Sequence, residues 1–143
     1  MSTQGIAPDD TGVLDVEGAR LRYRIEGHGE TCLVVGSSVC YPRMFSDGLR
    51  QGLRLVFADS RHFADPQHFA SADPSFQPDR ITLNGCADDI ELVRQALGLG
   101  DVVVIGHSVH ACLALARARR YRWSDLIGQR VLGVSGEGVE LRP

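Results

Sequence analysis

Lysine is absent from this 143-residue sequence, in which all 15 basic residues are arginines. We attribute this absence to a coding bias rather than to function. It excludes a phosphate-binding loop of the GxxxxGK[ST] type, which needs a lysine for the phosphates. The glycine pattern GxGxxG of dinucleotide-binding domains is also missing. A nucleotide-binding domain is therefore not expected.

Excess positive charge and long hydrophobic runs are lacking as well. The formal net charge is −3, which gives no electrostatic reason to expect nucleic acid or an anionic membrane as a partner. No apolar run approaches the roughly 20 residues that span a bilayer. The N-terminus lacks the charged and then apolar pattern of a signal peptide. We therefore expect a cytoplasmic protein.

Cysteines are few and do not form a CxxC pair or a metal-binding spacing. We expect reduced thiols in or near the core, and neither a metal nor a cofactor. The four positions are Cys32, Cys40, Cys86 and Cys112.

Strand and helix patterns alternate along the chain. Residues 12–26 alternate in the manner of a β-hairpin, and the apolar runs 31–36, 53–59 and 102–105 are typical of buried parallel strands. Residues 43–52 predict a short helix with Met44 and Leu49 turned inward. Residues 81–100 and 108–120 predict two longer helices. This order indicates an α/β fold with a mostly parallel sheet. Residues 1–11 are expected to form a disordered leader.

The segment GHSVH, residues 106–110, joins the third apolar run to the last helix. A sharp turn from strand to helix can expose a serine hydroxyl beside the free N–H groups of a helix N-terminus, where an oxyanion would be stabilised. Gly106 suits the crowding before Ser108, while His110 stands where a second glycine is usual. The same spacing also occurs as plain structure in many parallel α/β folds.

Several motifs occur in an order that resembles the N-terminal half of the α/β-hydrolase fold family, which includes proline iminopeptidases, esterases and epoxide hydrolases. The hairpin precedes the loop VGSS at residues 35–38, followed by ADSRHF at 58–63, CADDIELVRQALGL at 86–99 and VVVIGHSVHACLALARA at 102–118. The resemblance covers about residues 12–120. It implies an α/β-hydrolase-type mostly parallel sheet with flanking helices, truncated after the nucleophile strand and helix.

The resemblance also implies roles for individual residues. Ser108 would be the nucleophile of a serine hydrolase that cleaves an ester, amide or related bond of a small-molecule substrate. The backbone N–H of Val109 would be one oxyanion donor, and the second would come from Ser37 or Ser38. Asp59 and Arg61 would brace the loop rather than take part in the chemistry.

A histidine base and its acid do not follow in the order that the family uses. No histidine follows His110, and Asp125, Glu137 and Glu140 are the only later acids. A serine hydroxyl is a weak nucleophile without such a base. His62 and His68 are candidate surrogate bases, although both also fit solvent-exposed loop histidines. Activity of this chain is therefore expected to be weak or absent.

The last residues, 121–143, form an atypical tail that we expect to be out of frame, with a genuine short strand at 130–134 as the alternative. The four arginines between 117 and 122 fit a solvated helix end better than a phosphate-binding patch. An alternative function for the chain is a non-catalytic interaction or regulatory module derived from a hydrolase. An exposed sheet edge would then favour a homo-oligomer.

Overall fold

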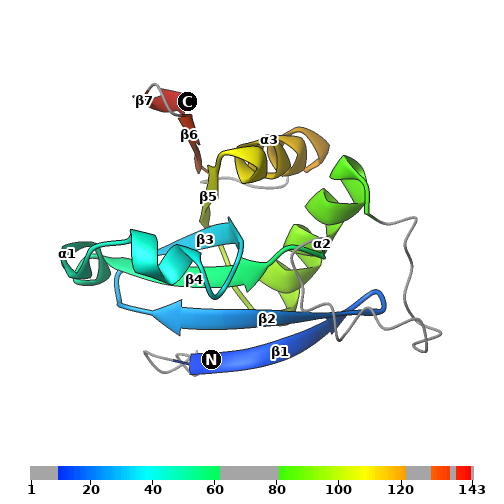
Figure 1. Cartoon of the computed structure of the whole chain (residues 1–143), viewed down its shortest axis with the longest axis horizontal. Helices are drawn as coiled ribbons and strands as arrows, with labels where there is room; N and C mark the ends of the chain where they lie inside the picture. The colour runs from blue at the N-terminus through cyan, green and yellow to red at the C-terminus, as the bar shows by residue number, and fades with distance from the viewer. Residues whose placement is uncertain (1–9, 62–80, 122–129, 136–137, 143) are drawn as a thin grey trace.

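A single mixed sheet organises the chain (Figure 1). The structure is a computed structural model, and it describes residues 10–61, 81–121, 130–135 and 138–142. Within these residues the sheet has seven strands in the order β1-β2-β4-β3-β5-β6-β7. The prediction of an α/β fold whose sheet is flanked by helices is confirmed.

The hairpin at the N-terminal edge joins β1 (Asp10–Val16) to β2 (Ala19–Glu26). Its two-residue turn has positive φ angles at Glu17 (44°) and Gly18 (79°), as expected of a tight turn that matches the twist of the strands. Because β1 begins at Asp10, the expectation that a disordered leader runs to residue 11 is wrong for its last two residues. Residues 1–9 lie outside the described part.

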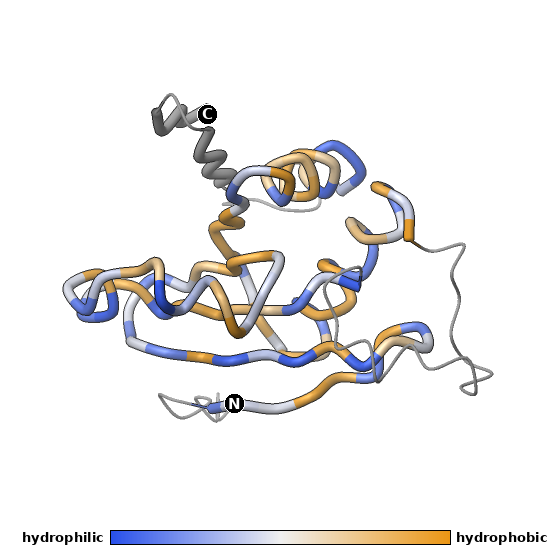
Figure 2. The backbone as a smooth tube through the Cα atoms, in the orientation of Figure 1, coloured by the Kyte–Doolittle hydropathy of each residue, from blue (hydrophilic) through white to orange (hydrophobic). Residues whose placement is uncertain are grey.

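Three parallel strands form the centre of the sheet: β3 (Glu30–Gly36), β4 (Leu53–Asp59) and β5 (Val103–His107). Their side chains are buried almost continuously, because both faces of the sheet are covered. One face packs against the helices and includes Leu33, Val56 and Val104. The other face includes Leu55, Phe57 and Ile105. In Figure 2 apolar colour is present along these strands and also on the helices.

The connection from β3 to β4 contains the short helices η1 (Tyr41–Met44) and α1 (Asp47–Arg50) instead of one helix over 43–52. The expected inward positions of Met44 and Leu49 are wrong, since they are 59% and 43% exposed. Polar contacts fix this segment instead: Arg50 pairs with the Glu26 carboxylate and donates to the carbonyls of Pro42 and Phe45.

The two longer helices, α2 (Leu83–Ala96) and α3 (Val109–Arg120), pack against each other and against the sheet. The Thr82 hydroxyl caps α2 by accepting from the Gly85 N–H at 3.0 Å. Gly98, with φ of 63°, follows the last turn of α2 in the left-handed conformation that is common after a helix end. No described helix is long and apolar enough to cross a membrane.

The sheet continues beyond α3, which corrects the expectation that it ends there. Strand β6 (Arg130–Ser135) pairs in parallel with β5, and β7 (Gly138–Arg142) pairs antiparallel with β6. The alternative interpretation of the tail, a short strand over 130–134, agrees with β6. The segment that forms β6 is largely apolar and lies beside β5. Its backbone N–H and C=O groups form hydrogen bonds with those of β5, and this pairing favours a strand although the tail has an atypical composition.

Candidate active site

The turn at Ser108 is a sharp elbow between β5 and α3. Ser108 has φ of 56° and ψ of −126°, and among the described non-glycine residues only Glu17 also has a positive φ. Such a conformation costs about 1–3 kcal/mol and persists only where the surroundings impose it. A Cβ atom at Gly106 would collide with the backbone of His110, so this position requires glycine. The local geometry is a tight, strained turn from strand to helix, as the sequence predicts.

The elbow presents its serine to solvent at the carboxyl ends of the parallel strands. Ser108 is exposed, and Val109, the first residue of α3, is 56% exposed. The first backbone N–H groups of a helix have no partner within the helix, and they carry the positive end of its dipole. A reacting carbonyl at Ser108 would therefore meet an environment that favours negative charge.

His110 is buried although it replaces the second elbow glycine. It is 4% exposed, and its ring lies edge-on to Tyr41 with 5.4 Å between the ring centroids. Gly36 provides the space: a Cβ there would approach Tyr41 Cε2 to 2.6 Å and His110 Cγ to 2.7 Å. Gly36 also has φ of 134°, which favours glycine. The glycine at the end of β3 thus leaves room for the His110 side chain on α3.

Tyr41 connects the loop after β3 to the elbow through two hydrogen bonds. Its hydroxyl donates to the His107 carbonyl at 3.2 Å, and its oxygen lies 2.5 Å from His110 Nδ1. Burial, and secondarily the neighbouring Cys40, raises the pKa of Tyr41. The phenol therefore keeps its proton for the His107 carbonyl. Sequence reasoning missed this contact because the residues lie 66 and 69 positions apart.

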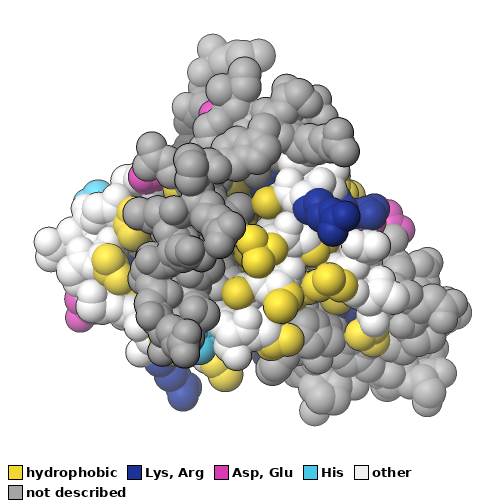
Figure 3. Space-filling model, turned by 90° about the horizontal axis from the view of Figure 1, so that it is seen from above, with side chains coloured by type: hydrophobic (Ala, Val, Ile, Leu, Met, Phe, Trp, Pro, Cys, Tyr) yellow, Lys and Arg dark blue, Asp and Glu magenta, His cyan; other side chains and the backbone are white. Residues whose placement is uncertain are grey.

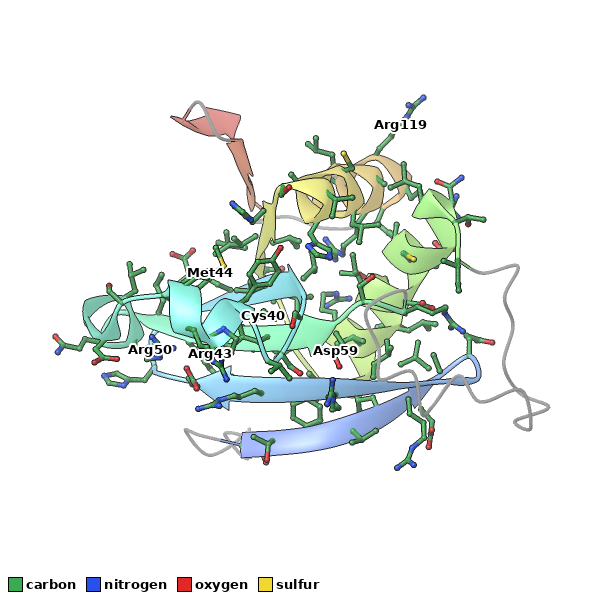
Figure 4. All side chains as sticks on the ribbon, in the orientation of Figure 1. Cys40, Arg43, Met44, Arg50, Asp59 and Arg119 are labelled. Carbon is green, nitrogen blue, oxygen red and sulfur yellow. The ribbon has the colours of Figure 1, made fainter. Side chains whose placement is uncertain are left out.

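The loop after β3 is also fixed by Asp59, at the carboxyl end of β4 (Figure 4). The carboxylate accepts from the backbone N–H and the hydroxyl of Ser38, both at 2.8 Å, and from Arg22 Nε at 3.0 Å. The Ser37 hydroxyl oxygen accepts from the N–H groups of Val39 and Cys40. Asp59 braces this loop as predicted, and it holds the Ser38 N–H away from any other acceptor.

Arg61 is completely buried and braces the hairpin rather than the loop after β3. Its guanidinium contacts both carboxylate oxygens of Asp89 on α2, at 2.8 and 3.1 Å. It also donates to the carbonyls of Val16 and Glu17 at the hairpin turn. Arg61 therefore fixes the hairpin turn against α2, which is a structural role.

Arg117 corrects the interpretation of the arginine-rich helix end as solvated. It is fully buried and donates to Glu91 Oε2 at 2.6 Å, and Glu91 also binds Arg94. Burial alone would raise the pKa of Glu91, but the hydrogen bonds from Arg94 and Arg117 outweigh it and lower the pKa. Among the described arginines of this helix end, Arg119 and Arg120 are exposed and fit the prediction, and Arg120 pairs with Asp88. Arg122 lies outside the described residues.

The two candidate surrogate bases, His62 and His68, lie outside the described residues. Arg61, which directly precedes His62, belongs to the described part and follows the carboxyl end of β4. The described histidines are His28 in the turn before β3, His107 at the end of β5, and His110.

Comparison with known proteins shows to which fold family this sheet with its helices belongs. The AB hydrolase superfamily protein YclE of Bacillus subtilis is 44% identical over 110 residues, which are 77% of this chain and 37% of that protein. This chain belongs to the α/β-hydrolase fold family. The α/β-hydrolase chain spans little more than a third of the length of this curated relative. No protein-family model matches the sequence.

Solved structures agree with this α/β-hydrolase fold. A mutant of the N-acyl homoserine lactonase AidH, complexed with N-hexanoyl homoserine, has a TM-score of 0.63 at 21% identity, over 94% of this chain and 51% of that one. A proline iminopeptidase-related protein from Thermus thermophilus has a TM-score of 0.62 at 23% identity, over 87% and 44%. At these identities the likeness shows the fold alone.

An open groove of about 640 Å³ lies on the outer surface of α3 in this α/β-hydrolase chain, away from Ser108. Figure 3 shows hydrophobic side chains gathered on this face, with arginine beside them. Leu83 and Leu115 in its lining are more than half exposed. The groove contains none of the elbow residues. Its lining consists of Leu83, Asn84, Cys112, Leu115, Ala116, Arg119 and Arg120.

Proposed function

We propose that this chain carries the nucleophile of a serine hydrolase that acts on an ester, amide or related bond of a small-molecule substrate. The observation that carries the proposal is the strained, solvent-exposed Ser108 directly before α3. A serine in a purely structural turn has no need of a positive φ that costs stability, whereas an elbow that projects a nucleophile does.

In the proposed reaction, Ser108 Oγ attacks the substrate carbonyl carbon, and the carbonyl electron pair moves to the oxygen. The Val109 N–H donates to this oxyanion. Ser37 is the better candidate for the second donor, because the Ser38 N–H is donated to Asp59. The Ser108 proton passes to a base, and the collapse of the tetrahedral adduct expels the leaving group and leaves an acyl-serine.

The proposed reaction needs a base that accepts the Ser108 proton. His62 and His68 follow β4 in sequence and are the candidates within the chain. Loss of the histidine or the serine from a catalytic triad lowers kcat by roughly 10⁶. We propose that one of these two histidines makes Ser108 reactive and that turnover of substrate by this chain is weak, because the base is not in the position that the family uses. A cytoplasmic location likewise stays a prediction from the sequence.

Labelling with a fluorophosphonate probe tests the proposal. We expect purified wild-type protein to be labelled at Ser108 and Ser108→Ala to be unlabelled. Ser46→Ala, which changes another exposed serine, is the matched control and should be labelled like the wild type. Absence of labelling in folded wild-type protein would contradict an activated Ser108. Loss of labelling in His62→Gln or His68→Gln would identify the base.

A non-catalytic interaction module is the second candidate, and the groove on α3 favours it. Exposed apolar side chains such as Leu115 are typical of interaction surfaces. Strand β1 is the outermost strand on its side of the sheet, and an unpaired strand edge can recruit a second copy. Light scattering over a range of concentrations tests this candidate: a concentration-dependent oligomer without probe labelling supports it, and a labelled monomer opposes it.

A further inference from the structure

The contact between Tyr41 and the peptide before Ser108 suggests a role beyond loop packing. The torsion φ of Ser108 describes rotation about its N–Cα bond, so the plane of the His107–Ser108 peptide sets that angle. Tyr41 donates to the carbonyl of this same peptide. A hydrogen bond at this atom opposes rotation of the peptide away from the strained conformation.

The proton arrangement allows one chain of hydrogen bonds. A phenol has a single proton, and the Tyr41 hydroxyl donates it to the His107 carbonyl. The 2.5 Å contact with His110 is then satisfied if the His110 Nδ1–H donates to Tyr41 Oη. In this arrangement His110 positions Tyr41, and Tyr41 positions the peptide.

Packing restricts both rings. Tyr41 is 7% exposed and His110 is 4% exposed. The Tyr41 ring lies edge-on to both His107 and His110, with centroid distances of 6.0 and 5.4 Å. The absence of a side chain at Gly36 leaves the space that both rings fill. The Tyr41 hydroxyl is therefore held at the His107 carbonyl by its surroundings.

We propose that Tyr41 and His110 are positioning residues that hold the His107–Ser108 peptide, and thereby the strained φ of Ser108, in the elbow conformation. The histidine at the second elbow-glycine position thus has a specific task, because it orients the tyrosine that fixes the nucleophile from the loop after β3. The effect on Ser108 reactivity rests on the proposed function, whereas the effect on its backbone does not.

Nuclear magnetic resonance of the full chain tests the backbone part. A residue with positive φ has a short distance between its amide and α protons, so Ser108 should show a strong intraresidue nuclear Overhauser effect (NOE). Tyr41→Phe keeps the ring and removes the hydroxyl, and we expect it to weaken this NOE. Tyr121→Phe is the matched control, because it removes a comparable hydrogen bond, from the Tyr121 hydroxyl to Asp88, at the far end of α3. It should leave the NOE unchanged.

Variants of His110 test the second residue. His110→Asn retains an N–H donor near the position of Nδ1 and should preserve the Ser108 NOE. His110→Leu retains apolar bulk without a donor and should weaken the NOE as Tyr41→Phe does. Equal behaviour of the asparagine and leucine variants would overturn the role of His110, and an unchanged NOE in folded Tyr41→Phe would overturn the role of Tyr41.

The fluorophosphonate probe separates this inference from the proposed function. We expect Tyr41→Phe to lower the maximal labelling rate roughly ten- to hundredfold, because small displacements of a reacting group have effects of this size. The half-saturating probe concentration should stay the same. A strong wild-type NOE that Tyr41→Phe weakens, in a protein that the probe never labels, supports the inference and contradicts the proposed function. Unchanged NOE and labelling in Tyr41→Phe contradict the inference alone.

Discussion

Residues of the same type differ in their exposure to solvent in this protein, and the four cysteines are an example. The sequence predicts four thiols in or near the core, and all four are free in the structure. Cys32 and Cys86 are buried as predicted, while Cys40 and Cys112 are exposed. The prediction was wrong for Cys40 and Cys112. On α3 the exposed side also carries apolar residues such as Leu115, so hydropathy did not identify the outer face of this helix.

This difference predicts selective chemical modification. Burial, with a smaller contribution from the Glu30 carboxylate, raises the pKa of the Cys32 thiol to about 11. The thiolate is the reactive form. We therefore expect a disulfide reagent such as DTNB at pH 8 to modify Cys40 and Cys112 quickly in folded protein, and Cys32 and Cys86 only in urea. Mass spectrometry of digests identifies the modified residues, and rapid modification of Cys32 in folded protein would contradict its burial.

The elements follow the sequence closely where a pattern is local. The predicted strand at 53–59 coincides with β4, and the predicted strand at 31–36 differs from β3 by one residue. Helix α2 begins at the capping Thr82 and ends before Gly98, both of which are sequence signals. A period of apolar residues and a cap depend on neighbours within a few positions, so sequence alone identifies them.

Parts of the candidate site could not be predicted, because their partners lie far away in the chain. The sequence predicted the sharp turn at Ser108, since glycine, strand and helix are contiguous there. It did not identify the burial of Arg117, whose partner Glu91 lies on the neighbouring helix. The contact of Tyr41 with the elbow was missed for the same reason. Such pairs depend on how elements pack, and no local pattern in a single sequence records that packing.

The packing of α2 against α3 should depend on pH through Glu91. Its pKa is lowered in the folded protein, so it contributes stability above its ordinary value of 4.5, and this contribution is lost as the pH falls through the lowered folded value. We expect the free energy of unfolding to fall between pH 5 and pH 3 less steeply in Glu91→Gln than in the wild type. Urea unfolding at each pH measures this slope.

A matched control separates Glu91 from the general effect of acid. Glu30 is exposed, so Glu30→Gln should retain the slope of the wild type. Identical slopes for Glu91→Gln and the wild type would mean that the carboxylate of Glu91 titrates alike in the folded and unfolded chains. That result would contradict its ion pairs with Arg94 and Arg117.

At the scale of the whole molecule, Arg61 holds together segments that are far apart in sequence. Its buried guanidinium joins the β1–β2 turn to Asp89 on α2. Removal of one partner of a buried ion pair typically costs about 3–5 kcal/mol. We expect Arg61→Met to lower the free energy of unfolding by about this amount, as measured by urea denaturation with circular dichroism.

An exposed arginine provides the comparison for Arg61→Met. Arg20 lies 3.9 Å from Asp15, and both side chains are more than half exposed. Such surface pairs contribute about 0–1 kcal/mol, so Arg20→Met should change stability by no more than this. Equal effects of the two substitutions would show that the buried pair contributes no more than a surface pair.

The strand order also has a consequence for the time course of folding. Both margins of the sheet are hairpins, β1–β2 and β6–β7, whose partners are adjacent in sequence and can meet early. The centre is different, because β5 must find β3 across some seventy residues, as the pairing of Cys32 with Val103 shows. Closing so long a loop is slow. We therefore expect the docking of β5 to limit the folding rate, so that Ser108, the residue after this strand, is among the last to reach its native conformation.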